Sequence, residues 1–185
     1  MLRVAVLMCV KDEADIIVEC LEHWVRLGAT DFYICDRGSS DDTVEKVRQF
    51  YISAWDKDNS IRIILFSKYQ SSFDNHLVIN DMKEQALLAG INWMFPADAD
   101  EVLNLPSGCD TLQEWLIHYP QKVASGTLPW LENEHWHTHR KAFGYFVSHV
   151  PDMQISIGNH EVEPYIRQLD PKNAFYRHKP YRSPE

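Results

Sequence analysis

Hydrophobic residues in the first hundred positions fall into short continuous runs separated by stretches with helical spacing. The run Val4–Val10 predicts a strand covered on both faces. Similar runs predict strands at Phe32–Cys35, Ile61–Phe66 and Trp93–Ala97. Between these runs, apolar residues at helical spacing predict helices over Ile16–Val25, Val44–Phe50 and Leu77–Ala89. This order predicts an α/β fold with a mainly parallel central sheet flanked by helices.

Polar residues mark the expected ends of the first two helices. Asp12 or Asp15 is positioned to cap the first helix, and Gly28 follows it as a C-terminal stop. Ser39 and Ser40 offer N-caps for the second helix. The turns between strands and helices are therefore expected to be short and ordered.

The pattern changes after Pro106. One short helix is expected at Leu112–His118, followed by aromatic and histidine-rich segments that read as short strands and loops. No repeat or flexible linker separates the two parts, so we expect one domain over 1–185, with 105–185 completing the half formed by 1–104. The polar ending lacks a capping element, which suggests a chain shorter than its family's usual length.

Composition narrows the class of protein. The 185 residues are 45% hydrophobic, which indicates a folded protein, and the net charge of −9 disfavours nucleic acid as a partner. No apolar run is long enough to span a membrane. Four scattered cysteines, without a C-x-x-C pair, are typical of reduced thiols in a cytoplasmic protein.

Acidic residues follow the fourth expected strand. Asp98 and Asp100 emerge where open α/β sheets bind ligands, with Glu101 directly after them. Carboxylates at this spacing can bind a hard divalent cation such as Mn²⁺ or Mg²⁺. The alternative is a solvated acidic loop.

A second carboxylate, Asp36, ends the second expected strand. It can accept hydrogen bonds from a nucleobase or a ribose, and Gly38 in the following turn allows a ligand to approach the backbone. The alternative is that Asp36 only fixes the turn before the helix.

Histidines are concentrated in the second half. The segment Gly158–Glu161 resembles the G-N-H-D/E box of calcineurin-like metallophosphoesterases, but the D-x-H and G-D-x-x-D motifs of those enzymes are missing here. A metallophosphoesterase-like hydrolase remains the second alternative function.

Three segments in order resemble glycosyltransferase family 2 and related enzymes of the GT-A fold. They are Val10–Glu13, Cys35–Thr43 and Ala97–Val102, and the opening further matches a subgroup at Ile17, Glu19, Leu21, His23 and Gly28. Asp12 and Arg37 depart from the commoner family residues. The resemblance implies a metal-dependent transfer of a sugar from a nucleotide-sugar donor to a saccharide or glycolipid acceptor.

The resemblance also suggests roles for individual residues. Lys11, Glu13, Asp36 and Ser39 would hold the nucleoside, and Asp98 and Asp100 the metal. The later family segments add His178 or His160 as a further metal ligand and Arg182 as a diphosphate partner. Glu132 or Glu134 would be the base that activates the acceptor hydroxyl.

Two further possibilities come from the second half. Trp130 and Trp136 could form a surface on which a sugar stacks, although most aromatic residues in a domain of this size belong to the core. The alternative to an enzyme is a non-catalytic nucleotide-binding or scaffold domain of the same fold.

Overall fold

A computed structural model describes residues 2–57, 59–67, 75–119, 124–132, 135–146, 154–155, 162–163, 168–169 and 174–178. The first half contains β1 (Val4–Val10), α1 (Ile17–Arg26), β2 (Asp31–Asp36), α2 (Thr43–Lys57), β3 (Arg62–Ser67), α3 (Asn75–Leu88), β4 (Trp93–Pro96) and β5 (Glu101–Asn104). The second half contains α4 (Leu112–Leu116), β6 (Ala124–Glu132), β7 (His135–Tyr145), β8 (Gln154–Ile155), β9 (Val162–Glu163), β10 (Gln168–Leu169) and β11 (Phe175–His178).

The main sheet has a parallel part and a mixed part. β3, β2, β1 and β4 lie side by side in that order and are parallel. The sheet then continues through β7, β6, β11 and β5, with β7 antiparallel to both of its neighbours. β11 runs parallel to β6 and antiparallel to β5. The predicted fold class, a mainly parallel sheet flanked by helices, is confirmed.

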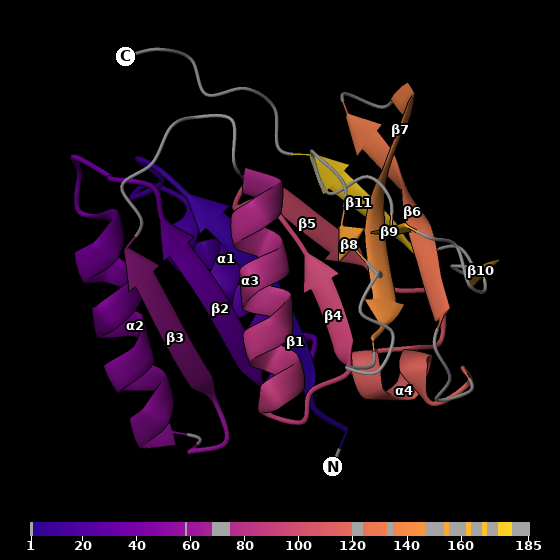
Figure 1. Ribbon diagram of the computed structural model, residues 1–185, viewed down its shortest axis with the longest axis horizontal. Helices are drawn as coiled ribbons and strands as arrows, with labels where there is room; N and C mark the ends of the chain where they lie inside the picture. Colours follow the sequence, from indigo (N-terminus) through magenta and orange to yellow (C-terminus); the bar gives the residue numbers. More distant parts are fainter. Residues whose placement is uncertain are drawn as a thin grey trace.

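Alternating side chains of the strands form two cores. On one face, Val6 and Met8 of β1 belong to a cluster with Trp24 of α1 and Trp115 of α4. On the other face, Leu7 belongs to a cluster with side chains of α3, which lies across the front of the sheet in Figure 1. Burial on both faces explains the continuous apolar run of β1.

The end of α1 is fixed by a close contact with the second half. Gly28 has a φ of +90°, in the left-handed region that favours glycine. A Cβ at this position would lie 2.3 Å from Gln113 Oε1. Gln113 Nε2 donates to the Gly28 carbonyl at 2.6 Å, so the glycine stop also joins α1 to α4.

Two expectations about elements are wrong in detail. The segments expected as short strands and loops include β6 and β7, which span nine and eleven residues. The N-cap of α1 is Ile16 without a side-chain cap, instead of Asp12 or Asp15. In the described part of the chain, no helix has the length and apolar character needed to cross a membrane.

Candidate functional site

Three loops leave the sheet at the carboxyl ends of β1, β2 and β4. Val10 pairs with Asp36 and Leu7 with Pro96, so the loops after these strands emerge at one edge. Cys9 of β1 lies near this edge. A hydrogen bond with Cys35, together with burial, raises the pKa of the Cys9 thiol. The positive charge of Arg37 lowers this pKa, and the negative charge of Asp98 raises it. Because β1 pairs with β2 on one side and β4 on the other, the loops after β2 and β4 flank the end of β1, where an α/β sheet binds ligands.

The loops after β1 and β2 are held together by hydrogen bonds. The Asp12 backbone N–H donates to Ser39 Oγ at 2.9 Å, and Asp12 Oδ1 accepts the Ser40 N–H at 2.6 Å. The Glu13 N–H donates to Thr43 Oγ1 at 2.8 Å. Asp12 has a φ of +54°, which aspartate and asparagine tolerate better than most residues. This backbone suits aspartate and asparagine alike.

Asp36 is buried and organises the turn that follows it. Its carboxylate accepts the Gly38 N–H at 3.2 Å, the Ser39 N–H at 3.0 Å and the Ser39 hydroxyl at 2.6 Å. The sequence predicts that Ser39 or Ser40 caps α2, and this prediction is wrong. The Ser39 hydroxyl donates to Asp36, and the Ser40 hydroxyl donates to Asp12. Asp41 instead accepts the Thr43 N–H at 2.9 Å. Asp36 thus has the turn-forming role, and its contact with a nucleoside stays a prediction.

The acidic segment after β4 forms a tight turn. The Asp98 N–H donates to Glu101 Oε2 at 3.0 Å, and the Glu101 N–H returns to the Asp98 carbonyl at 3.2 Å. Glu101 is only 1% exposed. Burial and then the neighbouring Asp98 charge raise the pKa of Glu101 to about 8, although Lys141 opposes the shift. The turn leaves Asp98 and Asp100 partly exposed at the edge of the sheet.

Lys141 of β7 brings a buried positive charge to this turn. Its Nζ lies 2.5 Å from Asp98 Oδ2 and 3.0 Å from Glu101 Oε1, and the side chain is 3% exposed. Burial alone would lower the pKa of Lys141, but the two carboxylates outweigh burial and raise it. The ammonium group therefore balances part of the acidic segment. The sequence reasoning missed Lys141, although its place two residues before buried Phe143 in a strand directs it toward the core.

His178 of β11 reaches the same turn from the opposite end of the chain. β11 pairs with β5 so that His178 lies opposite Glu101. His178 Nε2 lies 2.9 Å from Asp100 Oδ2, with the histidine side chain 15% exposed. The sequence indicates Asp100 and His178 as candidate metal ligands, but it does not show that the two side chains lie close together. The fold brings this one pair together.

The pair has a geometry that a divalent cation could use. Neighbouring ligands of an octahedral cation, each at about 2.1 Å, are about 3 Å apart, and carboxylate oxygen and imidazole nitrogen are both suitable donors for Mn²⁺. Among the residues that the structure describes, no three His, Cys, Asp or Glu side chains form a complete metal centre. Asp100 and His178 thus supply two of the ligands that a divalent cation would need.

The other candidate residues divide into placed and unplaced ones. Lys11 is exposed in the first loop, and Glu13 is half-buried beside it. Glu132 ends β6, and its side chain lies outside the described residues. Glu134, His160 and Arg182 lie outside them entirely, as does the Gly158–Glu161 segment of the metallophosphoesterase alternative.

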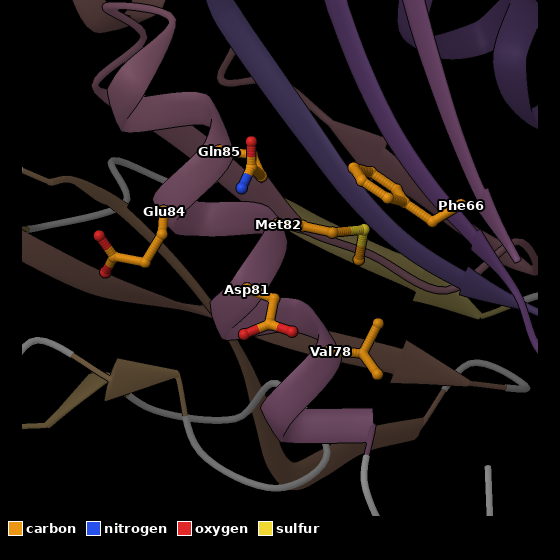
Figure 2. A pocket seen from close by; sticks show the side chains of 6 residues that line it. All are labelled: Phe66, Val78, Asp81, Met82, Glu84 and Gln85. Carbon is orange, nitrogen blue, oxygen red and sulfur yellow. The ribbon is translucent and has the colours of Figure 1, made fainter. Parts of the chain in front are cut away.

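A groove of about 340 Å³ lies elsewhere, between α3 and the end of β3. Figure 2 shows its lining side chains, which are Phe66, Val78, Asp81, Met82, Glu84 and Gln85. Its two carboxylates would repel a diphosphate. We therefore do not assign the groove to the donor.

No protein-family profile matches the chain, and no curated protein matches it in sequence. A mannosyltransferase from Pyrobaculum calidifontis, solved with GDP-Man and Mn²⁺, is similar over 68% of this chain and 35% of its own, at 21% identity and a TM-score of 0.49. Glucosyl-3-phosphoglycerate synthase from Mycobacterium tuberculosis, solved with Mn²⁺, UDP and glucosyl-3-phosphoglycerate, is similar over 71% of this chain and 44% of its own, at 13% identity and a TM-score of 0.41. The chain thus spans less than half the length of these solved proteins.

Proposed function

We propose that the chain is a metal-dependent glycosyltransferase domain of GT-A type, which moves a sugar from a nucleoside-diphosphate-sugar to a saccharide or glycolipid hydroxyl. The contact between Asp100 and His178 carries the proposal. It joins the D-x-D turn to a distant strand at the edge where three loops meet. The three ordered sequence motifs support the same activity. All four cysteines are within the described part of the chain, and each is a reduced thiol. Reduced thiols support a cytoplasmic location for the protein.

The donor would lie across the loops after β1, β2 and β4. Asp100 and His178, together with Asp98, would hold Mn²⁺ or Mg²⁺, which when bound neutralises charge on a leaving diphosphate. Lys141 binds one oxygen of Asp98 and so fixes the orientation of that carboxylate. Asp36 and Ser39 keep the second loop in shape beside the nucleoside, with Lys11 and Glu13 in the neighbouring loop. These contacts orient the donor before any transfer.

The residue roles in this paragraph, including the base for the acceptor, are proposed from the sequence alone. We assign the base that takes the acceptor proton to Glu132, the last residue of β6, or to Glu134, two positions later in the sequence. Arg182 would bind the diphosphate and His160 would be an alternative metal ligand. These assignments make distinct predictions, because a base acts only after the acceptor is bound.

A non-catalytic nucleotide-binding domain is the second candidate. It is favoured by the engagement of two carboxylates within the protein, Asp98 with Lys141 and Asp36 with its own turn. Such a domain would bind a nucleoside diphosphate with metal but would not transfer sugar.

Metal-dependent donor binding is tested by thermal unfolding with UDP or GDP, with and without Mn²⁺. A ligand at 100 times its Kd adds about 2.7 kcal/mol to stability. We expect Asp100→Asn and His178→Gln to lose most of the Mn²⁺-dependent gain, whereas Asp56→Asn, an exposed carboxylate on α2, should keep it. Equal gains in all variants, or a gain that survives EDTA, would refute the metal site.

Turnover separates the two candidate functions. Release of UDP or GDP from a panel of nucleotide-sugars, in the presence of mixed oligosaccharide acceptors, is expected only for the transferase. Glu134→Gln or Glu132→Gln should abolish transfer and leave donor affinity nearly unchanged. Donor binding without release from any nucleotide-sugar would favour the binding domain.

A further inference from the structure

Two cysteines face each other on neighbouring strands, close to the edge from which the loops leave. Cys9 of β1 and Cys35 of β2 are directly paired in the parallel register of the sheet. Both side chains lie on the face covered by α3, in the cluster that contains Leu7. A hydrogen bond joins the two thiols. The two sulfur atoms are therefore neighbours on one face of the sheet.

The two thiols differ in exposure. Cys9 is partly exposed, whereas Cys35 is 0% exposed. A reagent in solution therefore reaches Cys9 first, and Cys35 is placed to react with Cys9. Cys20 and Cys109 pack with the cluster on the opposite face of the sheet, so they are separated from this pair.

The spacing of the strands permits a disulfide between Cys9 and Cys35. A disulfide needs about 4.4–6.8 Å between Cα atoms, and neighbouring strands lie about 4.8 Å apart. It also needs about 3.8 Å between Cβ atoms, whereas side chains of directly paired parallel residues stay about as far apart as their strands. The bond would therefore pull the two strands together. Strained disulfides of this kind are readily reduced.

This pair of thiols is directly connected to the loops after β1 and β2. Cys9 and Cys35 each lie one residue before the end of their strand. The Cys35 thiol donates to the Asp36 carbonyl at 3.8 Å, and this contact would be lost with the thiol proton. The loops that follow are joined by the Asp12 N–H to Ser39 Oγ bond and by the Ser40 N–H to Asp12 bond. A shift of the strand ends would act on both bonds.

We propose that Cys9 and Cys35 form a reversible disulfide by exchange with a low-molecular-weight disulfide, RSSR, and that this bond loosens the contacts between the two loops. The Cys9 sulfur gives up its proton and attacks one sulfur of RSSR, which forms a mixed disulfide and releases one RSH. The Cys35 sulfur then gives up its proton and attacks the Cys9 sulfur, which releases the second RSH. Two protein thiols are oxidised, and one RSSR is reduced to two RSH. An excess of RSH reverses both steps.

The environment of Cys9 makes the exchange slow. The hydrogen bond with Cys35 and burial raise the pKa of the Cys9 thiol, so little of the reactive thiolate is present near neutral pH. The pair therefore responds to a lasting change in the ratio of disulfide to thiol rather than to a brief one. Transient disulfides of this type occur in reducing compartments.

The test is equilibration of the full chain with glutathione buffers of increasing disulfide content, followed by alkylation in denaturant and mass spectrometry. Cleavage by trypsin after Lys11 places Cys9 and Cys35 on separate peptides. We expect the number of alkylated cysteines to fall from four to two, with these two peptides linked, and to return to four in reduced glutathione. Cys9→Ala and Cys35→Ala should each abolish the link. Cys109→Ala, at another partly exposed cysteine, should retain it.

Hydrogen exchange measures the effect on the loops. In the oxidised protein, the Asp12 and Ser40 amides should exchange at least about tenfold faster than in the reduced protein. The Leu112 N–H is the internal control, because it donates to the Leu27 carbonyl at 2.7 Å near the far end of α1. Its exchange should be the same in both forms.

Several outcomes would overturn the proposal. They are alkylation of all four cysteines at every buffer ratio, a mixed disulfide at Cys9 that persists, a link that includes Cys20 or Cys109, or a bond that reduced glutathione does not reverse. Unchanged exchange at Asp12 and Ser40 in the oxidised protein would also overturn it. No nucleotide or metal is needed for these measurements. Failure of the disulfide and failure of the proposed glycosyltransferase activity therefore give different results.

Discussion

The two halves of the molecule contribute differently to the edge of the sheet at the carboxyl ends of β1, β2 and β4. In the first half, the loops after β1 and β2 are bonded to each other by Asp12, Ser39 and Thr43. In the second half, single side chains from distant strands reach the acidic turn: Lys141 from β7 and His178 from β11. Local hydrogen bonds thus shape the proposed nucleoside side, whereas sheet pairing places the charges of the proposed metal side. The two sides should respond differently to substitution.

The strongest way to break this arrangement is to remove Lys141. Lys141→Met would leave the buried Glu101 and its neighbour Asp98 without their cation. Loss of one partner of a buried ion pair costs about 3–5 kcal/mol. We expect a drop of that size in the free energy of unfolding, measured in urea at a pH above 8, where the Glu101 carboxyl is ionised.

The control is Lys57→Met, which removes an exposed lysine at the end of α2 and should change stability little. At the same pH, the double variant Lys141→Met with Glu101→Gln should recover part of the loss, because glutamine replaces the ionised Glu101 carboxylate. If the Lys141→Met protein is as stable as the wild type, the contacts of Lys141 with Asp98 and Glu101 contribute nothing to the free energy of unfolding.

The titration of Glu101 provides a pH test of the same junction. Its pKa is about 8 in the folded protein against 4.5 in its usual range. Between these values the folded state holds a proton that the unfolded state has released. The stability of the wild type should therefore fall as pH rises from 5 to 8, by at most about 1.4 kcal/mol per pH unit.

Glu101→Gln should lack this slope, so its stability relative to the wild type should rise with pH. Chemical denaturation at several pH values measures the difference. Parallel curves for the two proteins would mean that Glu101 is ionised throughout this range.

Gly28→Ala tests the join between α1 and α4. The new methyl group would meet Gln113 and would occupy a left-handed backbone position, so we expect a loss of about 1–2 kcal/mol. Gly108→Ala has a similar φ of +88° but no atom within 4 Å of the added Cβ. The difference in unfolding free energy between the two variants isolates the contact, and equal losses would assign the effect to the backbone alone.

The smallest expected effect concerns the loops of the first half. Ser39→Ala removes the hydroxyl that donates to Asp36 and accepts from Asp12, at a cost of about 1 kcal/mol in stability. Ser107→Ala, at an exposed loop position, should cost nothing measurable. If the loops shape the nucleoside side, Ser39→Ala should also weaken UDP or GDP binding in calorimetry. Unchanged affinity would limit Ser39 to loop stability.

The contrast between the halves also explains what could be predicted from the sequence. The sequence pattern located α3 and β4 to within two residues, because Gly90 follows the end of the helix and the strand is an uninterrupted apolar run. β7 was not expected as a long strand, since its histidines, Thr138 and Arg140 hide the alternation. The pairing of His178 with Glu101 depends on contacts between distant segments, which no local pattern contains. The motifs could therefore identify candidate ligands but not which of them meet.

The position of β11 between β6 and β5 has a consequence for synthesis of the protein. The ribosome releases the acidic turn well before it releases the strand that carries His178. Closing so long a loop slows the pairing of β11 with β5 and delays the contact with Asp100. The bonded loops after β1 and β2 would thus form before His178 could reach Asp100. If Asp100 and His178 bind a cation, as proposed, that binding would follow the pairing of β11 with β5.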